Sequence, residues 1–122
     1  MTFSKPVKKI KFSDFQNEVR SYFPNWELTF QELRQGSFLV DVQLPEEAVT
    51  IEYQNLFKSF QIDFCFVVYG KTVKEVLDNW IKNYKEDREK YVKELPDYPN
   101  RRNADDYYRL ADEFFNEIKG LD

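Results

Sequence analysis

The chain contains no histidine and only one cysteine among its 122 residues. Histidine is the side chain best suited to proton transfer near neutral pH, so its absence excludes nucleophile mechanisms of the Ser-His-Asp and Cys-His types. The commonest zinc ligand is missing for the same reason, and one thiol makes neither a zinc site nor an intramolecular disulfide. Cys65 stands inside an apolar run, where we expect a small buried hydrophobe. We therefore expect no metal, no cofactor and no enzymatic activity.

Long apolar runs are missing too. The longest, residues 64–69, is far shorter than the roughly 20 residues that span a bilayer. Residues 1–10 contain lysines but no apolar core of the kind found in secretory signals. These absences predict a cytoplasmic protein without a membrane partner. The length predicts a single domain over residues 1–122.

Residues 61–95 organise the chain. The first part of this stretch is rich in aromatic and β-branched residues, which favours a strand over a helix. Period two places one apolar set on one face (Ile62, Phe64, Phe66, Val68) and a second on the other (Cys65, Val67, Tyr69). We therefore predict one central strand with both faces covered. After Gly70, Thr72 and Glu75 form a capping-box pattern for a long amphipathic helix that ends before Pro96.

Two shorter helices are predicted, one towards each end of the chain. Ser13 and Gln16 form a second capping-box pattern, and Pro24 ends that helix because the residue before proline avoids the helical region. Asn103 with Asp106 can cap a last helix. The inner face of this last helix is predicted to consist of Tyr107, Leu110, Ala111, Phe114 and Ile118.

The remaining segments predict strands. Alternating apolar residues over 26–30 and 38–44, joined by a loop containing Gly36, predict an antiparallel hairpin. Residues 46–60 are ambiguous, and we favour a strand through Tyr53 followed by a helical turn. The fold class is therefore α+β: a small antiparallel sheet of three or four strands packed against about three helices, in the order α-β-β-(β)-β-α-α.

Two resemblances to known motifs lead to no family. Residues 70–72, Gly-Lys-Thr, are similar to the end of a phosphate-binding P-loop, but that loop needs a glycine at the position of Cys65. Thr72 is better explained as a helix cap. The element order is similar to that of the double-stranded-RNA-binding domain, whose second helix begins with a dense lysine cluster. Here only Lys71 and Lys74 are present, and the acidic balance disfavours RNA.

Acidic residues outnumber basic ones by 22 to 18, and they are unevenly distributed. Residues 21–70 sum to −5 (two basic, seven acidic), and residues 86–122 sum to −4 (seven basic, eleven acidic). The last predicted helix combines acids with more aromatic rings than one narrow apolar stripe accommodates. Exposed aromatic side chains ringed by charge are typical of protein interfaces. We therefore predict that partner binding involves Tyr108, Asp112, Glu113, Phe115 and Glu117.

These features predict a non-enzymatic, acidic protein-binding module, such as an inhibitor that blocks a basic target in the manner of nucleic-acid mimics and immunity proteins. A broader buried stripe on the last helix is the alternative explanation of the same rings. A second hypothesis is a nucleic-acid-binding accessory protein that uses the basic N-terminal arm, residues 1–11, with Lys5, Lys8, Lys9 and Lys11. A third is a homodimeric structural protein with Phe115 and Tyr108 at a two-fold interface, and a fourth is a carboxylate or Mg²⁺ enzyme.

Overall fold

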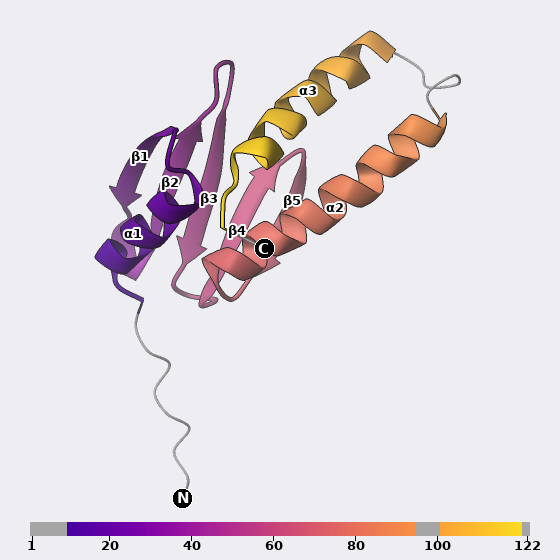
Figure 1. Cartoon of the computed structure of the whole chain (residues 1–122). Helices are drawn as coiled ribbons and strands as arrows, with labels where there is room; N and C mark the ends of the chain where they lie inside the picture. Colours follow the sequence, from indigo (N-terminus) through magenta and orange to yellow (C-terminus); the bar gives the residue numbers. More distant parts are fainter. Residues whose placement is uncertain (1–9, 95–100, 121–122) are drawn as a thin grey trace, which may run out of the picture.

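The computed structural model describes residues 10–94 and 101–120, which form a five-stranded antiparallel sheet and three α-helices (Figure 1). In chain order the elements are α1 (Phe12–Tyr22), β1 (Glu27–Glu32), the 3-10 turn η1 (Arg34–Gly36), β2 (Phe38–Gln43), β3 (Ala48–Gln54), β4 (Ser59–Phe64), β5 (Phe66–Gly70), α2 (Val73–Glu94) and α3 (Arg101–Glu117). The predicted α+β class is confirmed, with five strands in place of three or four.

The sheet is a meander in which strands that follow each other along the chain pair in the order β1-β2-β3-β4-β5. Its core face packs against the helices, and Val40, Ile51 and Ile62 from the three inner strands are each 0% exposed. Figure 1 shows the helices gathered on this one face. Because successive strand residues alternate between faces, every other side chain is left on the opposite face.

Helix α1 forms because it buries an apolar stripe on the sheet. Phe15 and Val19 are buried in the core, and Phe23, directly after the helix, is buried beside them. The predicted capping box is wrong: Ser13 lies inside the helix, and Lys11 takes the N-cap position without a side-chain hydrogen bond. Tertiary burial supplies most of the stability of a short helix, so α1 forms without the cap.

Helix α2 begins as predicted. Thr72 Oγ1 accepts a hydrogen bond from the Glu75 N–H at 3.0 Å, and Glu75 Oε1 accepts one from the Lys71 N–H at 3.1 Å. A Cβ on Gly70 would lie 2.4 Å from the backbone nitrogen of Val76, so only glycine lets β5 approach α2 this closely. Packing and capping together explain the Gly-Lys-Thr sequence at residues 70–72.

Trp80 is the point where α2, α3 and the sheet meet. Its side chain is 0% exposed, and its Nε1 donates to the carbonyl oxygen of Phe64 in β4 at 2.9 Å. The indole stacks on Tyr84 of the same helix and meets Phe114 of α3 edge-on, with ring centroids 4.8 Å apart. Edge-to-face and stacked rings of this kind fix the positions of the helices on the core.

The predicted single strand over residues 62–69 is wrong. The chain folds back at Cys65, which has a left-handed φ of 66°, and Phe64 pairs with Phe66 across the hairpin. The strand predicted to be central is therefore two strands, and β5 lies at the edge of the sheet. Its outer face is not covered, because Val67 and Tyr69 are 45% and 57% exposed. Cys65, which was expected to be buried, is half-buried.

Two other boundaries differ from the prediction. The strand through Tyr53 is confirmed, but the segment after it is a hairpin turn over residues 55–58 that leads into β4. Phe60, which was assigned to a helical turn, is a buried residue of β4. Helix α3 begins at Arg101, so the predicted cap Asn103 lies inside the helix.

Candidate functional site

The face of the sheet opposite the helices is exposed and acidic. Its side chains come from all five strands, and none of them is buried. The residues are Glu27, Thr29 and Gln31 of β1, Leu39, Asp41 and Gln43 of β2, Ala48, Thr50, Glu52 and Gln54 of β3, Ser59, Gln61 and Asp63 of β4, and Val67 and Tyr69 of β5. They include four carboxylates, Glu27, Asp41, Glu52 and Asp63, and no lysine or arginine. We refer to this surface as the acidic sheet face.

Neutral hydrogen-bond donors hold two of these carboxylates in place. Thr50 Oγ1 donates to Asp41 Oδ1 at 2.6 Å between β3 and β2. Gln54 Nε2 donates to Glu52 Oε2 and to Gln61 Oε1, each at 2.9 Å. The ion pairs found among the described residues use other acids, namely Glu46, Asp78, Glu89 and Asp112. Within the described part of the chain, the negative charge of the face is therefore positioned but not neutralised.

Apolar side chains border the acids at the β5 edge, where Val67 and Tyr69 are exposed. Tyr69 pairs with Gln61 and Gln61 with Glu52, so one cross-strand row combines an aromatic ring, an amide and a carboxylate. Asn79 of α2 donates to the carbonyl oxygen of Tyr69 at 2.6 Å. This bond satisfies a backbone acceptor at the sheet edge and leaves the tyrosine ring on the open face.

The carboxylates are spaced for separate cations. Asp41 and Asp63 lie two strands apart, and Glu52 lies on the strand between them, two residues along. With strands about 4.8 Å apart and a rise of about 3.4 Å per residue, the Cα atoms of the three stand about 8–10 Å from one another. Among the described residues, no group of three or more His, Cys, Asp or Glu side chains could hold a metal ion.

Asp112, predicted from the sequence to bind a partner, is engaged between the helices. The Tyr84 hydroxyl donates to its Oδ1, and an Arg88 guanidinium nitrogen donates to its Oδ2 at 3.1 Å. Burial, reinforced by the hydrogen bond to Asp112, raises the pKa of Tyr84 to about 12. Asp112 therefore joins α3 to α2, which is a structural role visible in the fold itself.

Tyr108 and Phe115 lie in the seam between α2 and α3. Tyr108 is only 3% exposed, so the expected exposure of its ring is wrong. The ring packs on Tyr91 with centroids 4.4 Å apart, and its hydroxyl donates to Asp87 Oδ2 at 2.5 Å. Phe115 is half-buried and stacks on Tyr84 at 4.9 Å. The alternative of a broader buried stripe accounts for both rings, and their role in binding a partner stays a prediction.

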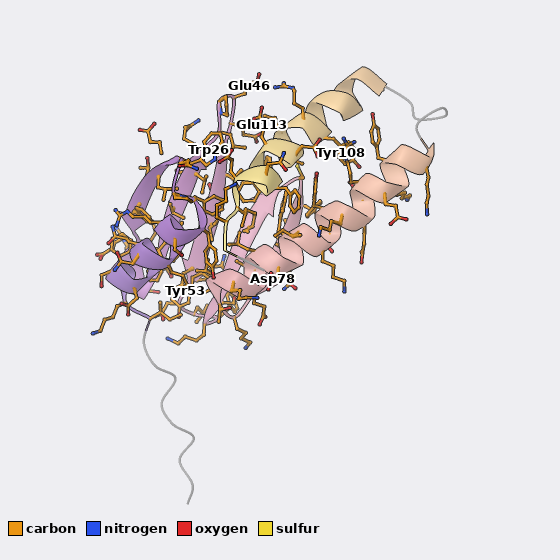
Figure 2. The ribbon with its side chains drawn as sticks, in the orientation of Figure 1. Trp26, Glu46, Tyr53, Asp78, Tyr108 and Glu113 are labelled. Carbon is orange, nitrogen blue, oxygen red and sulfur yellow. The ribbon has the colours of Figure 1, made fainter. Side chains whose placement is uncertain are left out.

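Glu113 and Glu117 are half-buried and share a face of α3, about 100° and about 140° from Asp112 around the helix. Figure 2 shows Glu113 on the same side of the molecule as Trp26. The Oε2 of Glu113 and the Nε1 of Trp26 are buried without a hydrogen-bond partner among the described residues. The structure therefore does not bring the three predicted acids of α3 together in one cluster.

The basic residues predicted as an alternative site lie mostly outside the described residues. This applies to Lys5, Lys8 and Lys9. Lys11 is described, and it is exposed directly before α1.

The acidic sheet face was not predicted from the sequence, although the alternation of acids with apolar residues is visible there. Summing charge by segment finds the acidic stretch 21–70 but does not separate the two faces of each strand. Asp41 stands between Val40 and Val42 in an alternating run, and the same alternation places Asp63 after Ile62. Assigning each position of these runs to a face gathers the acids on one side.

Within the described residues, no helix is sufficiently long and apolar to cross a bilayer. Comparisons of the chain with protein-family models, with curated proteins and with solved structures give no match.

Proposed function

We propose that this chain is a non-enzymatic protein-binding module that recognises a basic partner through the acidic sheet face. The observation that carries the proposal is the composition of that face: four carboxylates, several amides and hydroxyls, and no basic side chain. A surface of one sign of charge attracts a partner of the opposite sign, which speeds association and selects against acidic partners.

The hydrogen bonds on the face support this function because they fix the acceptors before a partner arrives. Asp41 and Glu52 are held by Thr50 and Gln54, so little side-chain freedom is lost when a lysine or arginine of the partner binds. Tyr69 at the β5 edge adds the aromatic contact that interfaces favour. A sheet face of this kind fits an elongated basic element laid across the strands.

The concrete form of the proposal is an inhibitor or antagonist that covers a basic groove of its target. Complexes of this type form rapidly and weaken as ionic strength rises, because part of their association rate comes from long-range attraction. Asp112 is engaged by α2, so of the acids predicted on α3 only Glu113 and Glu117 are kept as an alternative binding site, which the same measurements test.

Two variants with the same net charge test the proposal. The sheet-face variant combines Glu27→Gln, Asp41→Asn, Glu52→Gln and Asp63→Asn. The control variant combines Asp14→Asn, Glu18→Gln, Glu86→Gln and Glu89→Gln, all exposed on helices α1 and α2, which cover the other face of the sheet. Each variant loses four negative charges, which takes the net charge from −4 to 0. A difference in affinity between the two variants therefore depends on the position of the removed charges and not on their number.

The first probe is a lysine-rich peptide, whose affinity is measured by titration calorimetry at low and at physiological salt. We expect the sheet-face variant to bind at least about tenfold more weakly than the control variant. The second measurement is affinity capture from cytoplasmic extract with the native chain and both variants. A protein retained by the native chain and the control, but not by the sheet-face variant, supports the proposal. Equal binding by the two variants contradicts the proposal. A third variant, Glu113→Gln with Glu117→Gln, tests α3: if this variant alone fails to retain the protein, the binding site lies on α3 and the proposal is also contradicted.

A further inference from the structure

The end of the sheet where β3 turns into β4 exposes two neighbouring large apolar side chains. Leu56 is 85% exposed and Phe57 is 66% exposed, more than any other large hydrophobic residue that the structure describes. Both stand at the tip of the turn formed by residues 55–58. Single exposed apolar residues are common on protein surfaces, whereas adjacent ones on a projecting turn mark a contact site.

The turn is held firmly in this position. The backbone N–H of Asn55 donates to Ser37 Oγ at 3.0 Å, and Asn55 Nδ2 donates to the carbonyl oxygen of Gln35 at 2.7 Å. These bonds join the β3–β4 turn to the β1–β2 loop. Lys58 donates from Nζ to Asn55 Oδ1 and has a left-handed φ of 51°. The two apolar side chains are therefore presented on a braced tip and not on a free loop.

Each described connection at this end of the sheet carries one cation, and the nearest carboxylates stand in the strand and helices that adjoin the connections. The antiparallel order places the start of α1, the β1–β2 loop, the β3–β4 turn and the β5–α2 connection at this end (Figure 1). They contribute one exposed cation each, namely Lys11, Arg34, Lys58 and Lys71. Carboxylates occur in the adjoining elements, at Asp14 in the first turn of α1, Glu32 in β1 and Glu75 in the first turn of α2, whereas at the opposite end the β2–β3 loop itself carries Glu46 and Glu47. We refer to these connections, which carry cations in contrast to the acidic sheet face, as the basic end.

We propose that this basic end docks on an anionic lipid surface, with Leu56 and Phe57 inserted between the headgroups and the cations at headgroup level. The arrangement matches such an interface, since exposed apolar side chains for the acyl boundary stand beside exposed cations for the lipid phosphates. A nucleic acid would also attract the cations and could stack on Phe57. It offers no apolar medium to Leu56, which is the more exposed of the two.

This docking goes beyond the proposed partner binding and is compatible with it. Strands β1, β3 and β5 finish at the basic end and β2 and β4 begin there, so the acidic sheet face stands upright from a surface on which that end rests. The net charge of −4 disfavours an anionic membrane for the chain as a whole. That argument does not apply to an end whose connections hold only cations, because lipid charge acts within about one Debye length, roughly 10 Å.

Vesicle sedimentation tests the proposal with the full chain. The vesicles consist of phosphatidylcholine alone or of phosphatidylcholine with phosphatidylserine. The tip variant combines Leu56→Ser and Phe57→Ser, and its control combines Val67→Ser and Tyr69→Ser, which removes the other exposed apolar pair. Circular dichroism melting confirms that both variants fold. We expect the native chain and the control to sediment with the phosphatidylserine vesicles, and the tip variant to bind about tenfold more weakly.

A second measurement places the tip itself. Phe57→Trp introduces an indole at residue 57, and its fluorescence should shift to shorter wavelength when phosphatidylserine vesicles are added. The native chain, which contains two tryptophans, gives the baseline. Absence of binding to phosphatidylserine vesicles, equal binding by the tip variant and its control, or an unshifted spectrum overturns the proposal. Tighter binding to a single-stranded oligonucleotide than to the vesicles also overturns it, in favour of nucleic acid.

Discussion

Replacing Gly70 with alanine should destabilise the chain more than the same change at its other glycines. The new Cβ would lie 2.4 Å from the backbone nitrogen of Val76, 2.8 Å from its Cα and 2.9 Å from the carbonyl carbon of Glu75. These are backbone atoms in the first turn of α2, so they cannot rotate away as a flexible side chain can. Either β5 or α2 must move, and α2 carries the fully buried Trp80.

The magnitude follows from two opposing terms. Overpacking a well-packed region costs roughly 1–3 kcal/mol, and a backbone collision belongs at the upper limit, about 3 kcal/mol. Alanine restricts the unfolded chain more than glycine does, which returns about 0.4–1 kcal/mol. The free energy of unfolding should therefore fall by about 2 kcal/mol. For a chain of this size that corresponds to a decrease in Tm of about 8 °C.

Urea unfolding followed by circular dichroism measures the change, and Gly120→Ala serves as the matched control. No atom lies within 4 Å of a Cβ at Gly120, whose φ of 78° adds only the penalty of a left-handed alanine. That penalty is about 1 kcal/mol. If Gly70→Ala proves no more destabilising than Gly120→Ala, the close approach of β5 and α2 is refuted.

Three further predictions concern stability. The pKa of Tyr84 is raised from 10 to about 12 in the folded chain, so its stabilising contribution is complete below pH 10 and is lost as pH rises towards 12. In urea titrations over that window, the native chain should lose about 1–2 kcal/mol more than Tyr84→Phe, since solvent screening reduces the full effect of the shift, whereas parallel pH curves would contradict the assignment. Thr72→Ala removes the acceptor of the Glu75 N–H and should lower the unfolding free energy by about 1 kcal/mol, measured in the same assay; no change would argue against the cap. Lys58→Gly relieves a left-handed φ of 51°, worth about 1–2 kcal/mol, and loses about 0.4–1 kcal/mol because glycine frees the unfolded chain; the unfolding free energy should rise by about 0.5–1 kcal/mol, so a loss of stability would count against this backbone geometry.

The helices and the first hairpin could be predicted because their signals are local. The capping residues Thr72 and Glu75 fix the start of α2, and Gly36, with a φ of 79°, supplies one of the two left-handed residues of the loop between β1 and β2. The β4–β5 hairpin gives no such signal, since its left-handed residue is Cys65. With one residue between the paired positions, the inward set keeps its period of two, so a hairpin and a continuous strand produce the same apolar pattern.

The acidic sheet face depends on which strands are neighbours, and this is not a local property. Asp41, Glu52 and Asp63 alternate with core residues in three separate segments, and they form one surface only because β2, β3 and β4 are adjacent. The opposite holds for α3, where the sequence shows an acid-rich helix but not its packing. Asp112 and Tyr108 are engaged by α2, and only the tertiary structure reveals those partners.

The most direct test of binding through the acidic sheet face is to map where a basic ligand binds. The ¹⁵N-labelled chain is titrated with a lysine-rich peptide, and amide chemical shifts are followed residue by residue. If the acidic sheet face binds basic partners, the largest chemical-shift changes should occur on β2, β3 and β4 around Asp41, Glu52 and Asp63, and they should diminish as salt is added. Changes confined to α3 around Glu113 and Glu117, with the sheet unaffected, would contradict it.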